Sequence, residues 1–128
     1  MRPDAIARAR AAVRAAAAAA GVHRDRIDDL LVAVSEACTN AMEAQVRAGT
    51  ASPIDVTWAA DESVFEVQVT DHGDGFEPTE LPERPPVSDP RHLEVERGWG
   101  IQLMRQLVDE LVFDVTGDGM CVRLRLSL

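Results

Sequence analysis

Residues 24–48 place the strongest constraint on the fold. Their apolar side chains recur every three or four residues, the spacing of one face of an α-helix, at Ile27, Leu30, Leu31, Val34, Cys38 and Ala41. Gly49 and Pro53 follow directly and favour the end of a helix. The sequence therefore predicts a long helix over 24–48 with its apolar face in the core.

A shorter helix is predicted over 3–20. Pro3 suits a first helical turn, Asp4 lies at the positive end of the helix dipole, and Gly21 suits the cap. A third helix is predicted to begin near Gly98, and its apolar stripe is formed by Ile101, Met104, Val108 and Leu111.

Strands are predicted over 54–59 and 64–71, with a short polar turn between them. Apolar and polar residues alternate in the second strand, so Asp71 continues its core-facing side. Two more strands end the chain and are joined by the turn 116–119. We therefore expect a single domain over 1–128 with an α+β fold: a two-layer α/β sandwich, with helices on one face of a largely antiparallel sheet and a polar, free opposite face.

The stretch from Phe76 to Arg97 follows no helix or strand pattern and holds five of the seven prolines. A loop of this length is uncommon within a compact domain, and where it occurs it often covers an active site. We interpret it as a lid. A passive surface loop is the alternative.

The composition excludes several classes of function. The net charge of -9 argues against nucleic acid as a direct partner and favours a protein with basic patches. All thirteen basic residues are arginine, so neither a lysine-dependent phosphate loop nor Schiff-base chemistry is available. No apolar run is long enough to cross a membrane, and the two cysteines have no metal-like spacing. We expect a cytoplasmic protein with reduced core cysteines.

Glu36 and Asn40 are candidate site residues on the long helix. Four residues advance a helix by about 400°, so the two side chains project from the same side, one turn apart. An amide oxygen is a suitable Mg²⁺ ligand, and a nearby carboxylate can accept a proton from an attacking hydroxyl. The same spacing also occurs on ordinary solvated helices.

Asp71 and the glycines after it form the second candidate. A core-facing carboxylate is costly unless it is bonded, and the exocyclic amine of a purine is a suitable donor. Gly73 and Gly75 would let the backbone approach a base. An ion pair, or the start of a turn, is the alternative interpretation of Asp71.

The third candidate is the segment in which the last helix is predicted to begin. Gly98 and Gly100 would leave the amides of a helix N-terminus unhindered for an anion, with Arg97 as the adjoining cation.

Together, Ser35-Glu-Ala-Cys-Thr-Asn-Ala41, Asp71-His-Gly-Asp-Gly-Phe76 and Glu96-Arg-Gly-Trp-Gly-Ile-Gln-Leu-Met104 resemble the gyrase, heat-shock chaperone, histidine kinase and mismatch-repair (GHKL) ATPases. Within that superfamily the chain is similar to bacterial anti-sigma-factor serine kinases. The resemblance implies a histidine-kinase-like ATPase fold, with Glu36 as general base and Asn40 as Mg²⁺ ligand. It implies ATP or ADP binding by Asn40, Asp71, Gly73, Gly75, Phe76, Arg97, Gly98, Trp99, Gly100 and Ile101.

The resemblance also implies partners: a sigma factor, an antagonist whose serine is phosphorylated, and a second copy in a homodimer. The chain departs from the family pattern at Ala44, where a histidine is usual, and at Met120, near the usual position of a threonine. The usual leading strand before the first helix is also not evident. These departures leave two alternatives open: a nucleotide-gated binding switch with little catalysis, and an activator of a partner phosphatase.

Overall fold

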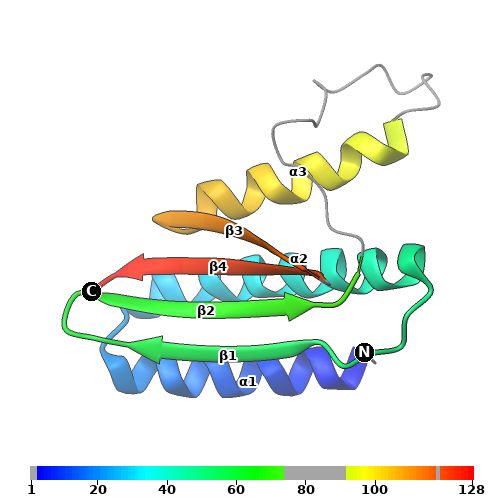
Figure 1. Ribbon diagram of the computed structural model, residues 1–128. Coiled ribbons are helices and arrows are strands. Elements are labelled where there is room, and N and C mark those ends of the chain that lie inside the picture. Colours follow the sequence, from blue (N-terminus) through cyan, green and yellow to red (C-terminus); the bar gives the residue numbers. More distant parts are fainter. Residues whose placement is uncertain (1–2, 74–91, 118) are drawn as a thin grey trace.

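The structure, a computed structural model, describes residues 3–73, 92–117 and 119–128, and of these it gives the backbone alone at 3, 92–99 and 116. The described helices are α1 (Pro3–Ala20), α2 (Arg24–Ala48) and α3 (His92–Leu107). The described strands are β1 (Asp55–Ala60), β2 (Val64–Asp71), β3 (Glu110–Thr116) and β4 (Gly119–Ser127). They form one antiparallel sheet in the order β1-β2-β4-β3, and all three helices lie on the same side of it (Figure 1). The expected two-layer α+β fold is confirmed.

Caps at both ends fix the length of α2. The Nδ1 atom of His23 accepts a hydrogen bond from the backbone N–H of Asp25 at 3.2 Å. Gly49 ends the helix in the left-handed conformation, with φ of 69°, which a residue without a Cβ adopts at little cost. The bounds of α1, α2 and β2 agree with those predicted from the sequence.

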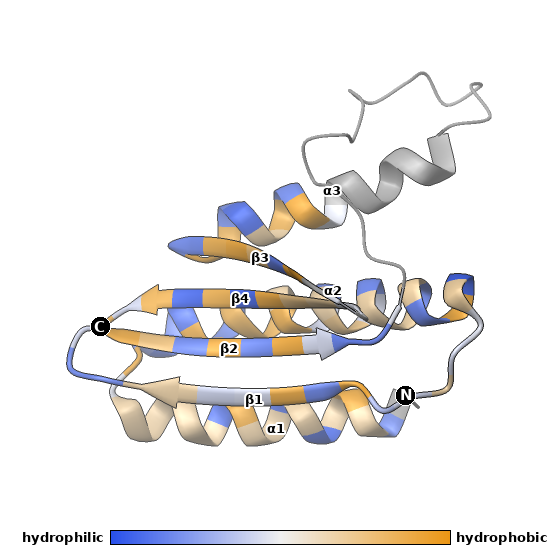
Figure 2. Ribbon diagram, in the orientation of Figure 1, coloured by the Kyte–Doolittle hydropathy of each residue, from blue (hydrophilic) through white to orange (hydrophobic). Residues whose placement is uncertain are grey.

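The core lies between α2 and the middle of the sheet. Phe65, Val67 and Val69 of β2 are buried, whereas the residues between them are partly exposed. Hydropathy alternates along β2 and β4 in the same way (Figure 2). Alternate side chains of a strand point to opposite faces, so one face of the sheet packs on the helices and the other is polar, as expected.

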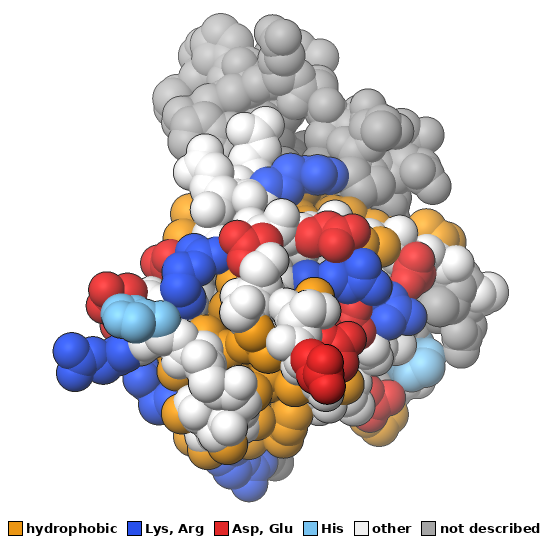
Figure 3. Space-filling view, turned by 90° about the vertical axis from the view of Figure 1, so that its left-hand side faces the viewer, with side chains coloured by type: hydrophobic (Ala, Val, Ile, Leu, Met, Phe, Trp, Pro, Cys, Tyr) orange, Lys and Arg blue, Asp and Glu red, His pale blue; other side chains and the backbone are white. Residues whose placement is uncertain are grey.

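A charge network covers the polar face. Glu66 of β2 accepts hydrogen bonds from Arg125 at 2.6 Å and Arg123 at 3.2 Å, and Arg123 also pairs with Asp114. Burial by itself raises the pKa of Glu66, but the hydrogen bond from Gln68 and the two arginines outweigh it, so its pKa lies below the ordinary value. Acidic and basic side chains lie next to one another in the end-on view (Figure 3). The charges on this face are thus largely compensated within the chain.

The structure corrects the expected course of α3. The helix begins at His92 instead of near Gly98, so it includes the last part of the predicted lid, 76–97. Residues 92–97 contain neither proline nor glycine, and nothing in their local sequence opposes a helix. At the other end α3 stops at Leu107, so two residues of the predicted stripe lie beyond it: Val108 follows the helix directly and Leu111 belongs to β3.

The remainder of the predicted lid lies outside the described residues. Among the helices that the structure does describe, none is both long and apolar enough to span a membrane.

Candidate functional site

The side chains of Glu36 and Asn40 converge on α3. A Cβ built on Gly100 would lie 2.9 Å from Oε2 of Glu36 and 3.8 Å from both Oδ1 and Nδ2 of Asn40. Both side chains are half-buried. The expectation that they project from the same side of α2 is therefore confirmed, and Gly100 lets the backbone of α3 approach them closely.

Asp71 is the last residue of β2 and lies on the helix-facing side of the sheet. It is one of two buried polar or charged side chains among the described residues and is only 5% exposed. Its Oδ1 atom accepts a hydrogen bond from the N–H of Gly73 at 2.8 Å. Within the described part of the chain no other donor reaches the carboxylate, so Oδ2 retains capacity to accept a hydrogen bond from a ligand.

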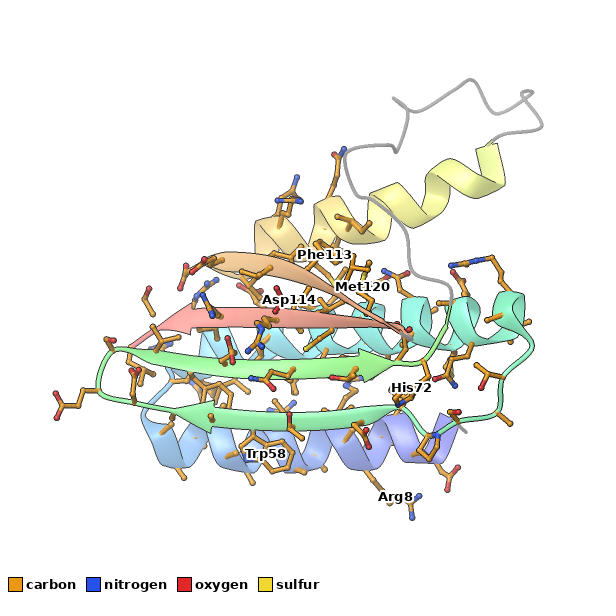
Figure 4. The ribbon with its side chains drawn as sticks, in the orientation of Figure 1. Arg8, Trp58, His72, Phe113, Asp114 and Met120 are labelled. Atoms are coloured by element: carbon orange, nitrogen blue, oxygen red, sulfur yellow. The ribbon has the colours of Figure 1, made fainter. Side chains whose placement is uncertain are left out.

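A narrow pocket connects these two parts of the site. It is lined by Ala37, Asn40, Ala41, Ala44, Asp71, Phe113, Met120 and Val122. Phe113 and Met120 lie near each other, between the sheet and the helices (Figure 4). The space holds about one water molecule, so a purine base could enter only if the walls moved apart. Its lining is mostly apolar, with one carboxylate and one amide.

Glycines allow the close packing around Asp71. A Cβ on Gly73 would lie 2.5 Å from the carbonyl carbon of Ala44, and one on Gly119 would lie 1.9 Å from the carbonyl oxygen of Asp71. Both contacts are with backbone, which cannot move aside as a flexible side chain can. Any larger residue at 73 or 119 would therefore displace the turn that carries the Asp71 carboxylate.

The remaining predicted site residues either do not line this pocket or lie outside the described part of the chain. Gly98 and Gly100 lie inside α3, where a backbone N–H ordinarily bonds to the carbonyl four residues earlier. The expected helix N-terminus at Gly98 is thus absent from this conformation. The side chain of Ile101 is 3% exposed and belongs to the core. Gly75 and Phe76 lie outside the described residues, as do the side chains of Arg97 and Trp99.

Several residues at the site were not predicted from the sequence, Phe113 and Gln45 among them. Phe113 of β3 contributes an aromatic wall to the pocket, and the guanidinium of Arg105 lies 6.0 Å from the centre of its ring. Gln45 is buried directly behind the Asp71 turn. Alternation along β3 could have identified Phe113 as core-facing, and Gln45 lies four residues after Ala41, in line with the predicted apolar stripe of α2.

Comparison with known proteins shows what the chain is similar to. Residues 1–126 match the family described as the histidine kinase-like ATPase domain. The serine-protein kinase RsbW of Bacillus licheniformis is 32% identical over 113 residues, which cover 86% of this chain and 71% of the relative. RsbW of Bacillus subtilis strain 168 is 31% identical over 112 residues, 85% of this chain and 70% of the relative. The family match covers α1, α2, β1, β2, α3 and β3 in full and β4 up to residue 126.

Proposed function

The chain belongs to the histidine kinase-like ATPase family, and from this premise we propose that it is an ATP-dependent serine-protein kinase. ATP binding follows from the family itself. The kinase assignment is supported by relatives named serine-protein kinases, at about one-third identity over most of both chains. The residues that would perform each step are the candidates on α2, β2 and α3.

One observation carries the proposal: the arrangement of Glu36, Asn40 and Asp71. A carboxylate and an amide on successive turns of α2 face Gly100, and the amide lines the same pocket as a buried carboxylate with acceptor capacity. This arrangement supports three neighbouring roles: Asp71 for recognition of the base, Asn40 on the phosphate side and Glu36 as proton acceptor.

Each residue has a specific role in the proposed site. Asp71 accepts a hydrogen bond from the exocyclic amine of adenine through Oδ2, while Oδ1 stays bonded to Gly73. The pocket walls of Ala37, Ala41 and Val122 contact the faces of the base. Guanine has a carbonyl in place of that amine, so the carboxylate disfavours it.

Asn40 suits a magnesium ion held mainly by phosphate. No group of three or more histidine, cysteine or acidic side chains that could hold a metal gathers among the described residues. Mg²⁺ commonly takes only one or two protein ligands and completes its shell with phosphate oxygens and water. A bound Mg²⁺ would supply charge neutralisation of the phosphates.

Glu36 is the proposed general base. It accepts the proton of the substrate serine as the serine oxygen forms a bond to the γ-phosphorus, and the bond from that phosphorus to the bridging oxygen of ADP breaks. Because Gly98 and Gly100 lie inside α3, their N–H groups reach the phosphates only if the first turns of α3 open. Arg97 is the proposed cation for the γ-phosphate.

The proposed partners are a sigma factor and a small antagonist carrying the phosphorylated serine. The net charge of -9 suits a partner with basic patches. A homodimer is also proposed, because the sheet has two edge strands, β1 and β3, among the strands described. Binding to the sigma factor would depend on which nucleotide is bound.

A nucleotide-gated binding switch with little catalysis is the second candidate. The close approach of Gly100 to the Glu36 carboxylate favours it, since α3 covers that side of the proposed base in this structure. Phosphotransfer separates the two candidates.

The deciding experiment is a phosphotransfer assay with γ-labelled ATP and a panel of small anti-sigma antagonists. We expect label on a serine of one antagonist, and about 10² to 10⁴-fold slower transfer by Glu36→Gln with nucleotide binding retained. Glu43→Gln is the matched control, because Glu43 is exposed on the same helix. ATP binding without transfer to any antagonist would favour the switch, and equal rates for Glu36→Gln and wild type would contradict the base assignment.

A further inference from the structure

Gln45 is a buried side chain for which the proposed catalysis provides no role. It is 6% exposed. Gln45 and Asp71 are the two buried polar or charged side chains among the described residues. Burial of an unbonded amide costs free energy. The bonds that satisfy this amide therefore indicate what the residue holds in place.

Both ends of the Gln45 amide are bonded to backbone on other segments. Nε2 donates to the carbonyl of Ser52 at 2.7 Å, and Oε1 accepts from the N–H of His72 at 3.1 Å. His72 follows directly after Asp71, and Figure 4 shows it at the end of β2. The next N–H, that of Gly73, donates to the Asp71 carboxylate. Gln45 thus holds the backbone of the turn in which the carboxylate is fixed.

The turn is also packed directly on α2. A Cβ on Gly73 would lie 2.5 Å from the carbonyl carbon of Ala44, the residue before Gln45. Asn40 lies on the same helix and lines the same pocket as Asp71. The distance between Asn40 and Asp71, the two polar residues that line the pocket, therefore depends on how the turn is held against α2.

We propose that Gln45 is a positioning residue that sets the Asp71 carboxylate for recognition of the 6-amino group of adenine. The inference rests on the proposed function, because it concerns the nucleotide pocket. Gln45 does not line that pocket, so it acts through the N–H of His72. Without this bond the turn moves, and the hydrogen bond to the base is lost while contacts with the rest of the nucleotide remain.

The test compares two Gln→Met variants on two nucleotides. Gln45→Met keeps the approximate shape of the side chain and removes both bonds. Gln68→Met is the matched control. Gln68 lies on the face of β2 opposite to that of Asp71, and like Gln45 it makes two side-chain hydrogen bonds. The probes are ATP and the triphosphate of purine riboside, which lacks the 6-amino group. Their affinities are measured by calorimetry on folded protein.

We expect wild type to prefer ATP, and Gln45→Met to lose about 10-fold in ATP affinity with the analogue unchanged within about 2-fold. Gln68→Met is expected to leave both affinities unchanged. A role in stability alone would weaken the two nucleotides equally. A wild-type ATP preference that persists in Gln45→Met would overturn the role of Gln45, whereas wild-type protein that binds neither nucleotide would contradict the proposed function itself.

If Gln45→Met does not fold, Gln45→Asn decides the question. Its amide is one methylene too short to reach His72, but it retains a polar group that can be solvated in place. We expect the same selective loss of ATP preference. Retained preference in Gln45→Asn, or failure of both variants to fold, would overturn the proposal and assign Gln45 a purely structural role.

Discussion

Gly100 of α3 packs against the Glu36 carboxylate so closely that a Cβ at residue 100 would lie 2.9 Å from Oε2. That atom is the far end of a flexible side chain, so the carboxylate can move aside at small cost to the fold. The contact therefore matters more for the position of the proposed base than for stability.

Gly100→Ala should separate these two effects. Alanine is favoured over glycine inside a helix by about 1 kcal/mol, so we expect the free energy of unfolding to stay the same or rise. The displaced carboxylate should lower phosphotransfer by about 10-fold or more. Denaturation curves and labelled-phosphate assays measure the two quantities.

Gly117→Ala is the control for that substitution, because among the described residues other than its chain neighbours no atom lies within 4 Å of a Cβ at residue 117. Unchanged transfer in Gly100→Ala would show that the position of Glu36 against α3 is irrelevant to activity.

Asp71→Asn should weaken ATP binding by about 1 to 3 kcal/mol. The asparagine oxygen can still accept from Gly73, but its NH₂ group would face the amine of the base, so two donors would meet. Calorimetry with ATP and GTP checks this, and Asp114→Asn on the polar face of the sheet is the control. Equal wild-type affinities for ATP and GTP would rule out recognition of adenine by Asp71.

Hydrogen exchange along α3 should respond to nucleotide. For Gly98 and Gly100 to donate to phosphate, the helix before them must open, because their N–H groups lie within the helix. We expect faster exchange at 92–97 with Mg-ATP, and unchanged exchange at 104–107 as the internal control. An exchange pattern identical with and without ATP would place the phosphates elsewhere.

Cys38 should make stability depend on pH in the alkaline range. Burial raises the pKa of its thiol from 9.0 to about 11. The unfolded chain therefore loses this proton first, and stability is fully present below pH 9 and falls as the pH rises toward 11. The loss amounts to roughly 2 kcal/mol. The chain has no tyrosine, and all its basic side chains except histidine are arginine, so few other groups titrate there.

Chemical denaturation at pH 8 and pH 10.5 measures this dependence. Cys38→Ala should reduce it. A wild-type stability equal at the two pH values would show that Cys38 ionises as readily in the folded protein as in the unfolded chain.

Local signals in the sequence were sufficient for α1, α2 and β2. Caps and regular apolar spacing depend on neighbours within a few residues, so the bounds of α2 and the shared side of Glu36 and Asn40 followed from helix geometry alone. The alternation along β2 likewise placed Asp71 on the core side. The two glycines of α3 misled the interpretation, because glycine signals a helix end only when the residues before it do not themselves form a helix.

The sequence by itself therefore determined α1, α2 and β2 and the sides that Glu36, Asn40 and Asp71 face. Only the tertiary structure decided which of them meet. The backbone contacts of Gly119 with Asp71 and of Gly73 with Ala44, and the bond from His72 to Gln45, join segments that lie far apart in the chain. No periodicity encodes such contacts, because they depend on the packing of α2 against the sheet and on which strands become neighbours.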